Sequence, residues 1–443
     1  MSCLHTDSKC DRLFPKKAWR HSMILIKNGI LVRPERKEME ELDIVIQEGM
    51  VKELGKNYDD AQFEQVINAK GMLVAPGLID VHVHFRDPGF TQKEDTITGA
   101  NAAKKGGFTT VITMANTRPA VDNIETLEYL LKKGNETGIH VIPSAAISVG
   151  LKGEELVNME ELKAHGAAGF TDDGIPLMSE KLVLQAMEEA KRLNVPLSFH
   201  EEDRNFIETP GVNQGAVSEK LGLGGASALA EDILVARDGM LALETGATIN
   251  IQHISSKRSV ECVRFYKKMG ASIFAEATPH HFSLDETAVL EHGTLAKMNP
   301  PLRTKEDQAA IIHGLKDGTI DIIATDHAPH TKEEKEKTFT QAPSGIIGLE
   351  TALALGITNL VKKGHLTMPE LIAKMTVNPA RLYQLDCGTI EPGKPADLVI
   401  FNPDEEWTVD GFASKAANSP FSGATLNGKI HYTICNGKIV YQD

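Results

Sequence analysis

Short hydrophobic runs alternate with longer segments of helical pattern through the middle of this chain. Eight runs have the composition of strands and cover residues 78–85, 109–115, 140–147, 167–173, 196–201, 248–255, 272–280 and 321–327. Helical patterns lie between several of them, at residues 93–105, 124–133, 180–193 and 228–245. Strands that alternate with helices form a parallel sheet, and a count of eight predicts closure into a (β/α)8 TIM barrel. An open doubly wound α/β sheet is the alternative.

The two ends of the chain have a different pattern, of short β-type runs separated by glycine and charged turns. These runs cover residues 24–32, 42–47, 50–54 and 66–69 near the start, and 396–401, 407–409 and 430–440 near the end. A small strand set needs partners to bury one face, so both ends are predicted to meet in one composite β domain. The expected division is 23–75 and 385–443 for this domain and 76–384 for the barrel. Residues 1–22 are basic and irregular, and we interpret them as an N-terminal extension without ordered structure.

Composition narrows the function classes. The formal net charge of -14 argues against a nucleic-acid-binding surface, which needs basic patches. The five cysteines are odd in number and scattered, which favours a reducing cytoplasm. No apolar run approaches the roughly 20 residues that a membrane helix needs. The chain is therefore expected to be a cytoplasmic enzyme with neither a nucleic-acid nor a membrane partner.

His82 and His84 are the most informative residues. Side chains alternate along a strand, so both imidazoles point to the same side. The turn-forming residues 86–89 end the run directly after them, which places both histidines at the carboxyl end of the strand. Ligands and catalytic groups of α/β barrels gather at that end. Two neutral nitrogen ligands so placed can begin a metal site, although a single such histidine is more often a structural residue.

Other strand candidates also end in metal-ligand residues. In the pair Asp172 and Asp173 only one side chain can face the barrel axis, and Asp173 is chosen because Gly174 leaves it free to turn inward; a simple Asp-Asp-Gly turn is the alternative. The remaining ends supply His200, His253 and Asp326. If the barrel closes, four imidazoles and two carboxylates converge on one mouth. That set suffices for two divalent ions sharing a bridging carboxylate and a bridging water.

Five motifs extend this pattern: DVHVHFRDPG at 80–89, MANTRP at 114–119, GFTDDG at 169–174, KMNPPLR at 297–303 and IATDHAPH at 323–330. On these motifs the sequence, from residue 23 to 443, resembles the dihydroorotases of the bacterial class I type in the amidohydrolase superfamily. The resemblance implies a distorted (β/α)8 barrel with a small β domain built from both chain ends.

The resemblance also implies a ligand set for two Zn2+ ions per subunit. His82, His84 and Asp326 would hold one ion, His200 and His253 the other, and Asp173 would bridge them. Many relatives bridge their metals with a carboxylated lysine, but residues 167–174 contain no lysine and Lys163 lies in a helical stretch. This favours a class I dihydroorotase over a hydantoinase. Mn, Co or Fe remain alternatives to Zn, because such ligands bind all of them.

The substrate that the resemblance implies carries a carboxylate. Arg86 can bind this carboxylate through two parallel hydrogen bonds. The substrate-binding set implied by the resemblance is Arg86, Asn116, Asn299, His330, Ser344 and Gly345. Asn116 and Asn299 could instead be turn residues, and His330 could brace the loop that follows it. Ser344 departs from the family, which often has an aromatic residue there, so the covering of the substrate ring is in question.

The implied activity is the reversible cyclisation of N-carbamoyl-L-aspartate to L-dihydroorotate in de novo pyrimidine biosynthesis. Metal-bound hydroxide would attack the ring amide, with Asp326 as general base and then general acid. Lower pH should therefore favour cyclisation. His327 faces the other way and is interpreted as structural, and residues 331–342 are either a mobile lid or a solvated charged face.

Two alternatives stay open at this point: an allantoinase or hydantoinase-type cyclic amidohydrolase, and a non-catalytic scaffold for aspartate transcarbamoylase. A homodimer and a contact with aspartate transcarbamoylase are the protein partners considered.

Overall fold

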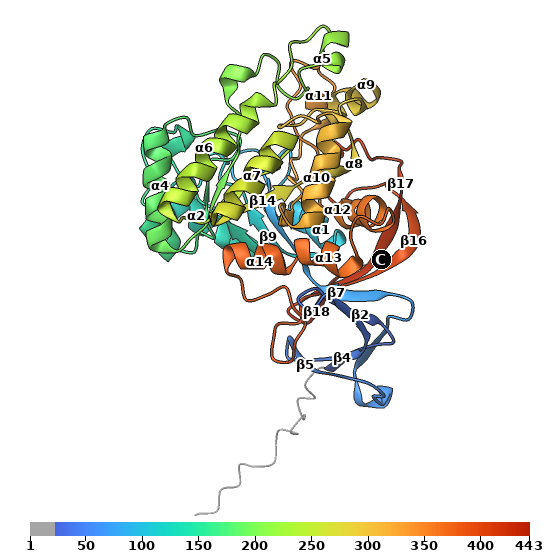
Figure 1. Ribbon diagram of the computed structural model, residues 1–443. Coiled ribbons are helices and arrows are strands. Elements are labelled where there is room, and N and C mark those ends of the chain that lie inside the picture. The colour runs from blue at the N-terminus through green and yellow to red at the C-terminus, as the bar shows by residue number, and fades with distance from the viewer. Residues whose placement is uncertain (1–22) are drawn as a thin grey trace, which may run out of the picture.

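The computed structural model describes residues 23–443, and a closed barrel of parallel strands lies at its centre (Figure 1). Hydrogen bonds join the strands in the orders β10-β9-β8 and β11-β12-β13-β14-β15. Parallel bridges from Ala145 to Phe170 and from Val83 to His327 connect these two groups at both edges. The barrel therefore closes in chain order, which confirms the TIM barrel and excludes the open sheet. Its strands are β8 (Leu78–Val83), β9 (Phe108–Thr113), β10 (His140–Pro143), β11 (Phe170–Thr171), β12 (Leu197–Phe199), β13 (Ile249–Ile251), β14 (Ile273–Ala277) and β15 (Ile322–Ile323).

Helices pack around the outside of the barrel (Figure 1). The helix α4 shows why they form: the Ser179 side chain accepts a hydrogen bond from Leu182 N at its start, and its apolar residues recur every three or four positions and are buried. The longer helices are α1 (Thr96–Lys105), α2 (Ile124–Gly134), α4 (Glu180–Leu193), α6 (Leu229–Thr245), α7 (Lys257–Met269), α10 (Lys305–Asp317), α13 (Met368–Lys374) and α14 (Val377–Tyr383). The shorter ones are α3 (Met159–Ala164), α5 (Ala216–Lys220), α8 (Pro279–Ser283), α9 (Ala288–His292), α11 (Lys332–Lys335) and α12 (Ala352–Gly356), with the single turns η1 (Asp60–Gln62), η2 (Val149–Leu151), η3 (Arg204–Phe206), η4 (Gly293–Ala296) and η5 (Ile357–Val361).

The two ends of the chain share a six-stranded sheet of order β18-β17-β16-β7-β2-β3. Its strand β7 pairs antiparallel with β16 and parallel with β2, so early and late segments are neighbours. A second, four-stranded sheet has the order β5-β4-β1-β6. The strands are β1 (Met23–Lys27), β2 (Ile30–Arg33), β3 (Glu38–Glu41), β4 (Asp43–Gln47), β5 (Met50–Gly55), β6 (Gln65–Asn68), β7 (Leu73–Pro76), β16 (Leu398–Thr408), β17 (Thr425–Cys435) and β18 (Lys438–Gln442). The domain boundaries remain a prediction, and the extension 1–22 lies outside the described residues.

Several expected strands differ from those observed. The run 24–32 is two strands in different sheets, because Asn28 adopts a left-handed conformation (φ 63°) between them. The run 430–440 likewise divides into β17 and β18 at Asn436 (φ 48°). The fourth and eighth barrel strands are two residues long instead of seven. In both segments the hydrophobic residues continue beyond the last hydrogen bond to a neighbouring strand. A hydrophobic run therefore predicts burial more reliably than it predicts where a strand ends.

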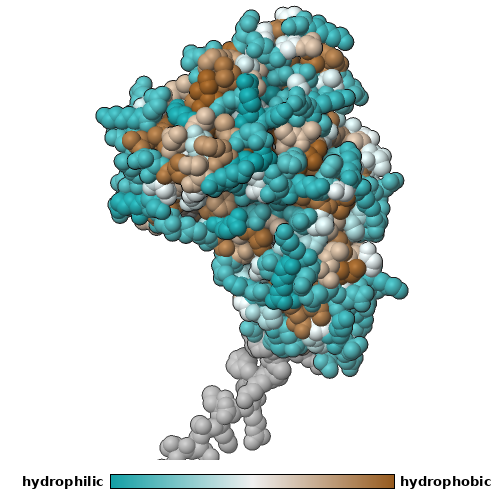
Figure 2. Space-filling view, viewed as in Figure 1, coloured by the Kyte–Doolittle hydropathy of each residue, from teal (hydrophilic) through white to brown (hydrophobic). Residues whose placement is uncertain are grey.

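The surface facing the viewer is largely hydrophilic, with scattered apolar side chains (Figure 2). Within residues 23–443, no helix combines the length and apolar character needed to cross a membrane. The loops that follow the barrel strands, with α5, α9 and α11, lie at the end of the molecule opposite the four-stranded sheet (Figure 1).

Candidate metal centre and active site

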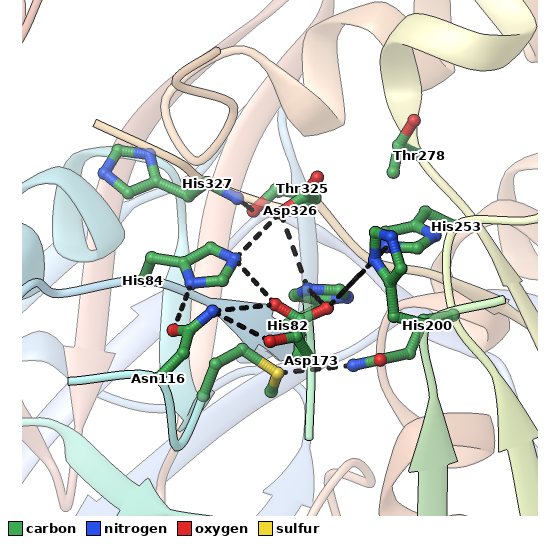
Figure 3. A network of polar contacts seen from close by, with 12 residues as sticks. His82, His84, Asn116, Asp173, His200, His253, Thr278, Thr325, Asp326 and His327 are labelled. Carbon is green, nitrogen blue, oxygen red and sulfur yellow. Dashed lines mark hydrogen bonds and ion pairs between the residues drawn. The ribbon is translucent and has the colours of Figure 1, made fainter. Parts of the chain in front are cut away.

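Asp173 lies at the centre of a buried cluster of histidines and carboxylates (Figure 3). Its Oδ1 is 3.3 Å from His82 Nε2, and its Oδ2 is 3.3 Å from His84 Nε2. Asp326 approaches the same two imidazoles, with Oδ1 3.1 Å from His84 Nε2 and 3.5 Å from His82 Nε2. The first and last barrel strands therefore bring donors to one point together with the fourth.

His200 and His253 lie on the other side of Asp173. Asp173 Oδ1 is 3.5 Å from His200 Nδ1 and 3.7 Å from His253 Nε2. The two ring nitrogens are themselves only 2.9 Å apart. All six residues that the sequence nominated as metal ligands thus come together at the carboxyl end of the barrel.

The choice between the two aspartates follows from local hydrogen bonds. Asp172 turns away from the barrel axis and accepts hydrogen bonds from Ile147 N (2.7 Å) and Ser148 N (3.1 Å). Asp173 turns inward, with its own N–H donated to Thr171 Oγ1 and Gly174 following at φ 78°. The glycine reverses the chain without the steric cost that a side chain would bring.

Strained backbone accompanies the site. Arg86, His253 and Asp326 have φ values of 60°, 32° and 49°, in the left-handed region that side chains other than glycine rarely adopt. Each follows a barrel strand that has ended, so the reversal aims the side chain over the barrel mouth. Such conformations persist where surrounding structure fixes them, and they concentrate at functional sites.

Three imidazoles have one ring nitrogen held from outside, which leaves the other facing the cluster. Glu276 Oε1 is 2.6 Å from His82 Nδ1, Asn116 Oδ1 is 3.0 Å from His84 Nδ1, and Glu202 Oε2 is 2.9 Å from His200 Nε2. Partners of this kind fix the tautomer and ring orientation of metal-binding histidines. Sequence reasoning missed Glu276 and Glu202; an ionisable Glu276 inside the hydrophobic run 272–280 was the available signal.

The electrostatics of the cluster fit a cation. His82 Nε2 and Asp173 Oδ1 are buried and form no hydrogen bond within the described chain. Burial lowers the pKa of His82 and His200, but the neighbouring carboxylates outweigh it, so that the pKa of His82 rises well above its usual value and that of His200 to about 10. Protons thus take the place of positive charge that a metal would supply. Imidazole and carboxylate donors suit divalent metals. Three overlapping triples have ligand atoms within 4.8 Å of one another: His82, His84 and Asp173; His82, His253 and Asp326; Asp173, His200 and His253.

A cavity of about 200 Å³ adjoins the cluster. Five of the six predicted metal ligands line it. All the residues predicted to bind substrate line it as well: Arg86, Asn116, Asn299, His330, Ser344 and Gly345. Asn116 does not act as a turn cap, because its amide nitrogen donates to Asp173 O at 3.1 Å and to Asp173 Oδ2 at 3.2 Å. His330 does brace a loop, since its Nε2 is 2.9 Å from Ser344 O, and it also faces the cavity.

His327 points away from the cluster (Figure 3). Its Nδ1 accepts a hydrogen bond from Gly348 N at 3.2 Å, and its Nε2 is 3.4 Å from Glu94 Oε2. These contacts join the end of the eighth strand to two neighbouring segments, which agrees with a structural interpretation.

A further group with metal-ligand atoms lies at the opposite end of the barrel and consists of His140, Asp397 and Cys435. Its polar atoms already have partners within the chain: His140 Nε2 is 3.0 Å from Asp397 Oδ2, and Asp397 Oδ1 accepts Asn436 N at 2.6 Å. It therefore lacks the unpartnered atoms that mark the barrel mouth.

Comparison with known proteins agrees with this geometry. The model of the Amidohydrolase family matches residues 73–440. The chain is 61% identical over 419 residues to a dihydroorotase of Clostridioides difficile (strain 630), an alignment that covers 95% of this chain and 100% of the relative. It is 55% identical over 423 residues to a dihydroorotase of Clostridium acetobutylicum, with 95% and 100% covered. Among solved structures it resembles an L-hydantoinase (dihydropyrimidinase) from Arthrobacter aurescens, with a TM-score of 0.84, 26% identity and 95% and 96% of the two chains covered. The chain belongs to the amidohydrolase family and, within it, to the dihydroorotases.

Proposed function

We propose that this chain is a dihydroorotase, which interconverts N-carbamoyl-L-aspartate and L-dihydroorotate in pyrimidine biosynthesis. One observation carries the proposal: a buried cluster of four imidazoles and two carboxylates borders the same small cavity as Arg86. The cluster can activate water for attack on an amide, and the guanidinium can hold the carboxylate of an anionic substrate. The relatives named dihydroorotase match nearly the whole chain, which supports the assignment.

The cluster is proposed to hold two divalent cations, with Zn2+ favoured by the nitrogen-rich donor set. His82, His84 and Asp326 would bind one, His200 and His253 the other, and Asp173 would lie between them. When bound, such cations lower the pKa of a water from about 15.7 toward 7 and polarise a carbonyl oxygen.

Each remaining residue has a defined task. Arg86 donates from Nε to Pro329 O at 3.3 Å, and its Nη2 lies 3.4 Å from His330 Nε2, so its terminal nitrogens are proposed to bind the substrate carboxylate beside His330. Asn116, Asn299 and His330 orient the ring, and Asn299 Oδ1 is a buried acceptor without a hydrogen bond in the described chain. In hydrolysis Asp326 takes the proton from the attacking water and delivers it to the leaving ring nitrogen; in cyclisation it returns the proton along the reverse path.

The alternatives fit less well. The resemblance implies a carboxylated lysine as the bridging group of hydantoinase-type relatives, whereas this chain offers Asp173, and hydantoin has no carboxylate for Arg86 to bind. A non-catalytic scaffold would not need six converging donors, all of which are present. Neither the cyclic amidohydrolases of other specificity nor the scaffold is therefore favoured.

A substrate panel tests the assignment. Purified protein, loaded with Zn2+ and analysed for metal content, is assayed with L-dihydroorotate, N-carbamoyl-L-aspartate, allantoin and hydantoin. We expect turnover of the first two alone. Hydrolysis of hydantoin or allantoin without any reaction of dihydroorotate would replace the proposal by the rival specificity.

We also propose where the enzyme acts and with which partners. A cytoplasmic location, a homodimer and a contact with aspartate transcarbamoylase are consistent with a pyrimidine-pathway enzyme. Sedimentation of the purified protein, alone and mixed with the transcarbamoylase, measures both associations.

A further inference from the structure

Two buried lysines lie beside the proposed substrate cavity, Lys297 and Lys335, called here the lysine pair. Their exposed fractions are 2% and 4%. Lys335 Nζ donates to the main-chain carbonyls of Pro343 (2.9 Å), Gly345 (3.0 Å) and Lys297 (3.4 Å). Lys297 Nζ donates to those of Phe339 (2.6 Å) and Ala342 (2.7 Å). Among residues 23–443, the hydrogen bonds of both ammonium groups go to main-chain carbonyls.

Burying an ammonium group is costly unless its hydrogen bonds are replaced. Lys335 has three N–H donors and three carbonyl acceptors, so its donors are matched in number. Lys297 supplements its two carbonyls with the ring of Phe339, whose centroid lies 5.1 Å from Nζ. The two amino groups therefore hold residues 339–345 at four carbonyls.

That stretch, residues 339–345, ends in two residues that line the cavity. Gly345 N donates to Lys297 O at 2.9 Å, which closes the attachment from the main-chain side. Gly345 has φ 131°, and a Cβ there would meet Ala328 Cβ at 2.8 Å and His330 Nε2 at 3.1 Å. The stretch is therefore pressed against the loop after the eighth strand, with no room for a side chain at Gly345.

The same stretch sets the state of His330. Ser344 O lies 2.9 Å from His330 Nε2, while Lys93 Nζ lies 3.3 Å from His330 Nδ1. Arg86 Nη2 and Glu334 Oε2 lie farther away, 3.4 Å from Nε2 and 3.5 Å from Nδ1. The shorter contact of each nitrogen decides the tautomer: a carbonyl can only accept and an ammonium can only donate, so Nε2 carries the hydrogen and the ring is neutral. Burial, together with the charges of Arg86 and Lys93, lowers the pKa of His330 to about 2, which agrees with a neutral ring.

We propose that Lys335 and Lys297 are positioning residues for substrate binding: they hold residues 339–345 so that Ser344, Gly345 and His330 meet the substrate beside Arg86. The inference rests on the proposed function, since it assigns these contacts to a carboxylated cyclic amide. Neither lysine touches the reacting atoms, so their loss should weaken binding of substrate and transition state alike. That pattern raises KM and leaves kcat nearly unchanged.

The test compares three variants of the metal-loaded full chain on L-dihydroorotate. Lys335→Met leaves three carbonyls without a donor, and we expect KM to rise about tenfold or more with kcat within about threefold of wild type. Lys335→Arg keeps a charged donor and should retain most of the affinity. Lys332→Met is the matched control, because Lys332 lies on the same helix with its side chain 82% exposed, and it should leave both constants unchanged.

Hydrogen exchange gives a second readout, and its measurement on the wild-type holoenzyme does not depend on any variant folding. The amide of Gly345 and its neighbours in 339–345 should be strongly protected, and Lys335→Met should lose this protection without change in the barrel strands. An unchanged KM in Lys335→Met, a fall in kcat alone, or fast exchange of 339–345 in wild type would each overturn the positioning role. Absence of dihydroorotate turnover in wild type would instead refute the proposed function.

Discussion

The histidine and aspartate cluster lines the cavity, whereas the lysine pair holds a segment whose end, Ser344 and Gly345, lines it; these two buried polar clusters differ in what completes them. In the histidine and aspartate cluster, His82 Nε2 and Asp173 Oδ1 converge without a hydrogen bond. In the lysine pair, the hydrogen bonds of both side chains go to carbonyls of the described chain, and the Phe339 ring supplements those of Lys297. Burial and charge are common to both, so neither property identifies a reactive centre. Unpartnered atoms that face one another do, because they leave a place for a group from outside.

The clusters also differ in where their members come from. The metal-ligand cluster draws on strands or strand ends spread from His82 to Asp326. Four of the five carbonyl acceptors of the lysine pair lie within one short segment, residues 339–345. Disrupting the metal-ligand cluster should therefore abolish turnover, whereas weakening the lysine pair should change only the affinity for substrate.

Removing the metal should produce the largest difference between the two clusters. Dialysis against a chelator is expected to reduce dihydroorotate turnover to background, and one to two equivalents of Zn2+ should restore it. The apo protein should also melt at a lower temperature, because a ligand that binds only the folded state stabilises it. Full activity in protein shown by elemental analysis to be metal-free would contradict the assignment of the cluster.

Asp326→Asn separates proton transfer from metal binding. The amide keeps the size and one oxygen donor of the carboxylate but cannot accept the proton of the attacking water. We expect kcat to fall by about 10²- to 10⁴-fold with metal content retained. The readouts are kcat and elemental analysis of the same preparation. Near-normal kcat would remove Asp326 from the general-base role.

Glu276→Gln probes the outer support of the metal-ligand cluster. Glu276 Oε1 is 2.6 Å from His82 Nδ1, and a neutral amide would hold the imidazole less strongly. Metal affinity should fall by about 10- to 100-fold, measured by competition with a chromogenic chelator. Glu291→Gln serves as control because that side chain is 79% exposed. Equal affinities in the two variants would show that Glu276 does not tune the site.

The lysine pair should be visible in the pH dependence of stability. Burial, aided by the charge of Lys297, lowers the pKa of Lys335 from 10.5 to about 7 in the folded state. Between about pH 7 and 10 the unfolded chain therefore binds more protons at this residue, so its contribution to stability rises with pH and is flat below pH 7. Relative to Lys335→Met, wild type should gain on the order of a few kcal/mol across this range, measured by denaturant titration at each pH. A constant difference between the two proteins would mean that Lys335 keeps an ordinary pKa.

Much of the fold and of the cluster could be predicted from the sequence. Periodicity gave the eight barrel strands, and alternation along a strand put His82 and His84 on one side. Asp173 could be chosen over Asp172 because a following glycine permits the reversal that turns it inward. These features could be predicted because each is set by residues that are close together in the sequence.

Only the tertiary structure decided which distant groups meet. Glu276 contacts His82 across 194 positions, and Lys335 reaches carbonyls that any sequence would supply. The ends of β11 and β15 were likewise beyond local pattern, since ladder hydrogen bonds depend on a neighbouring strand. The amino-acid sequence by itself determined the identity and local direction of the side chains proposed as metal ligands. Barrel closure decided that these side chains meet, because a contact between residues far apart in the chain produces no periodic pattern in the sequence.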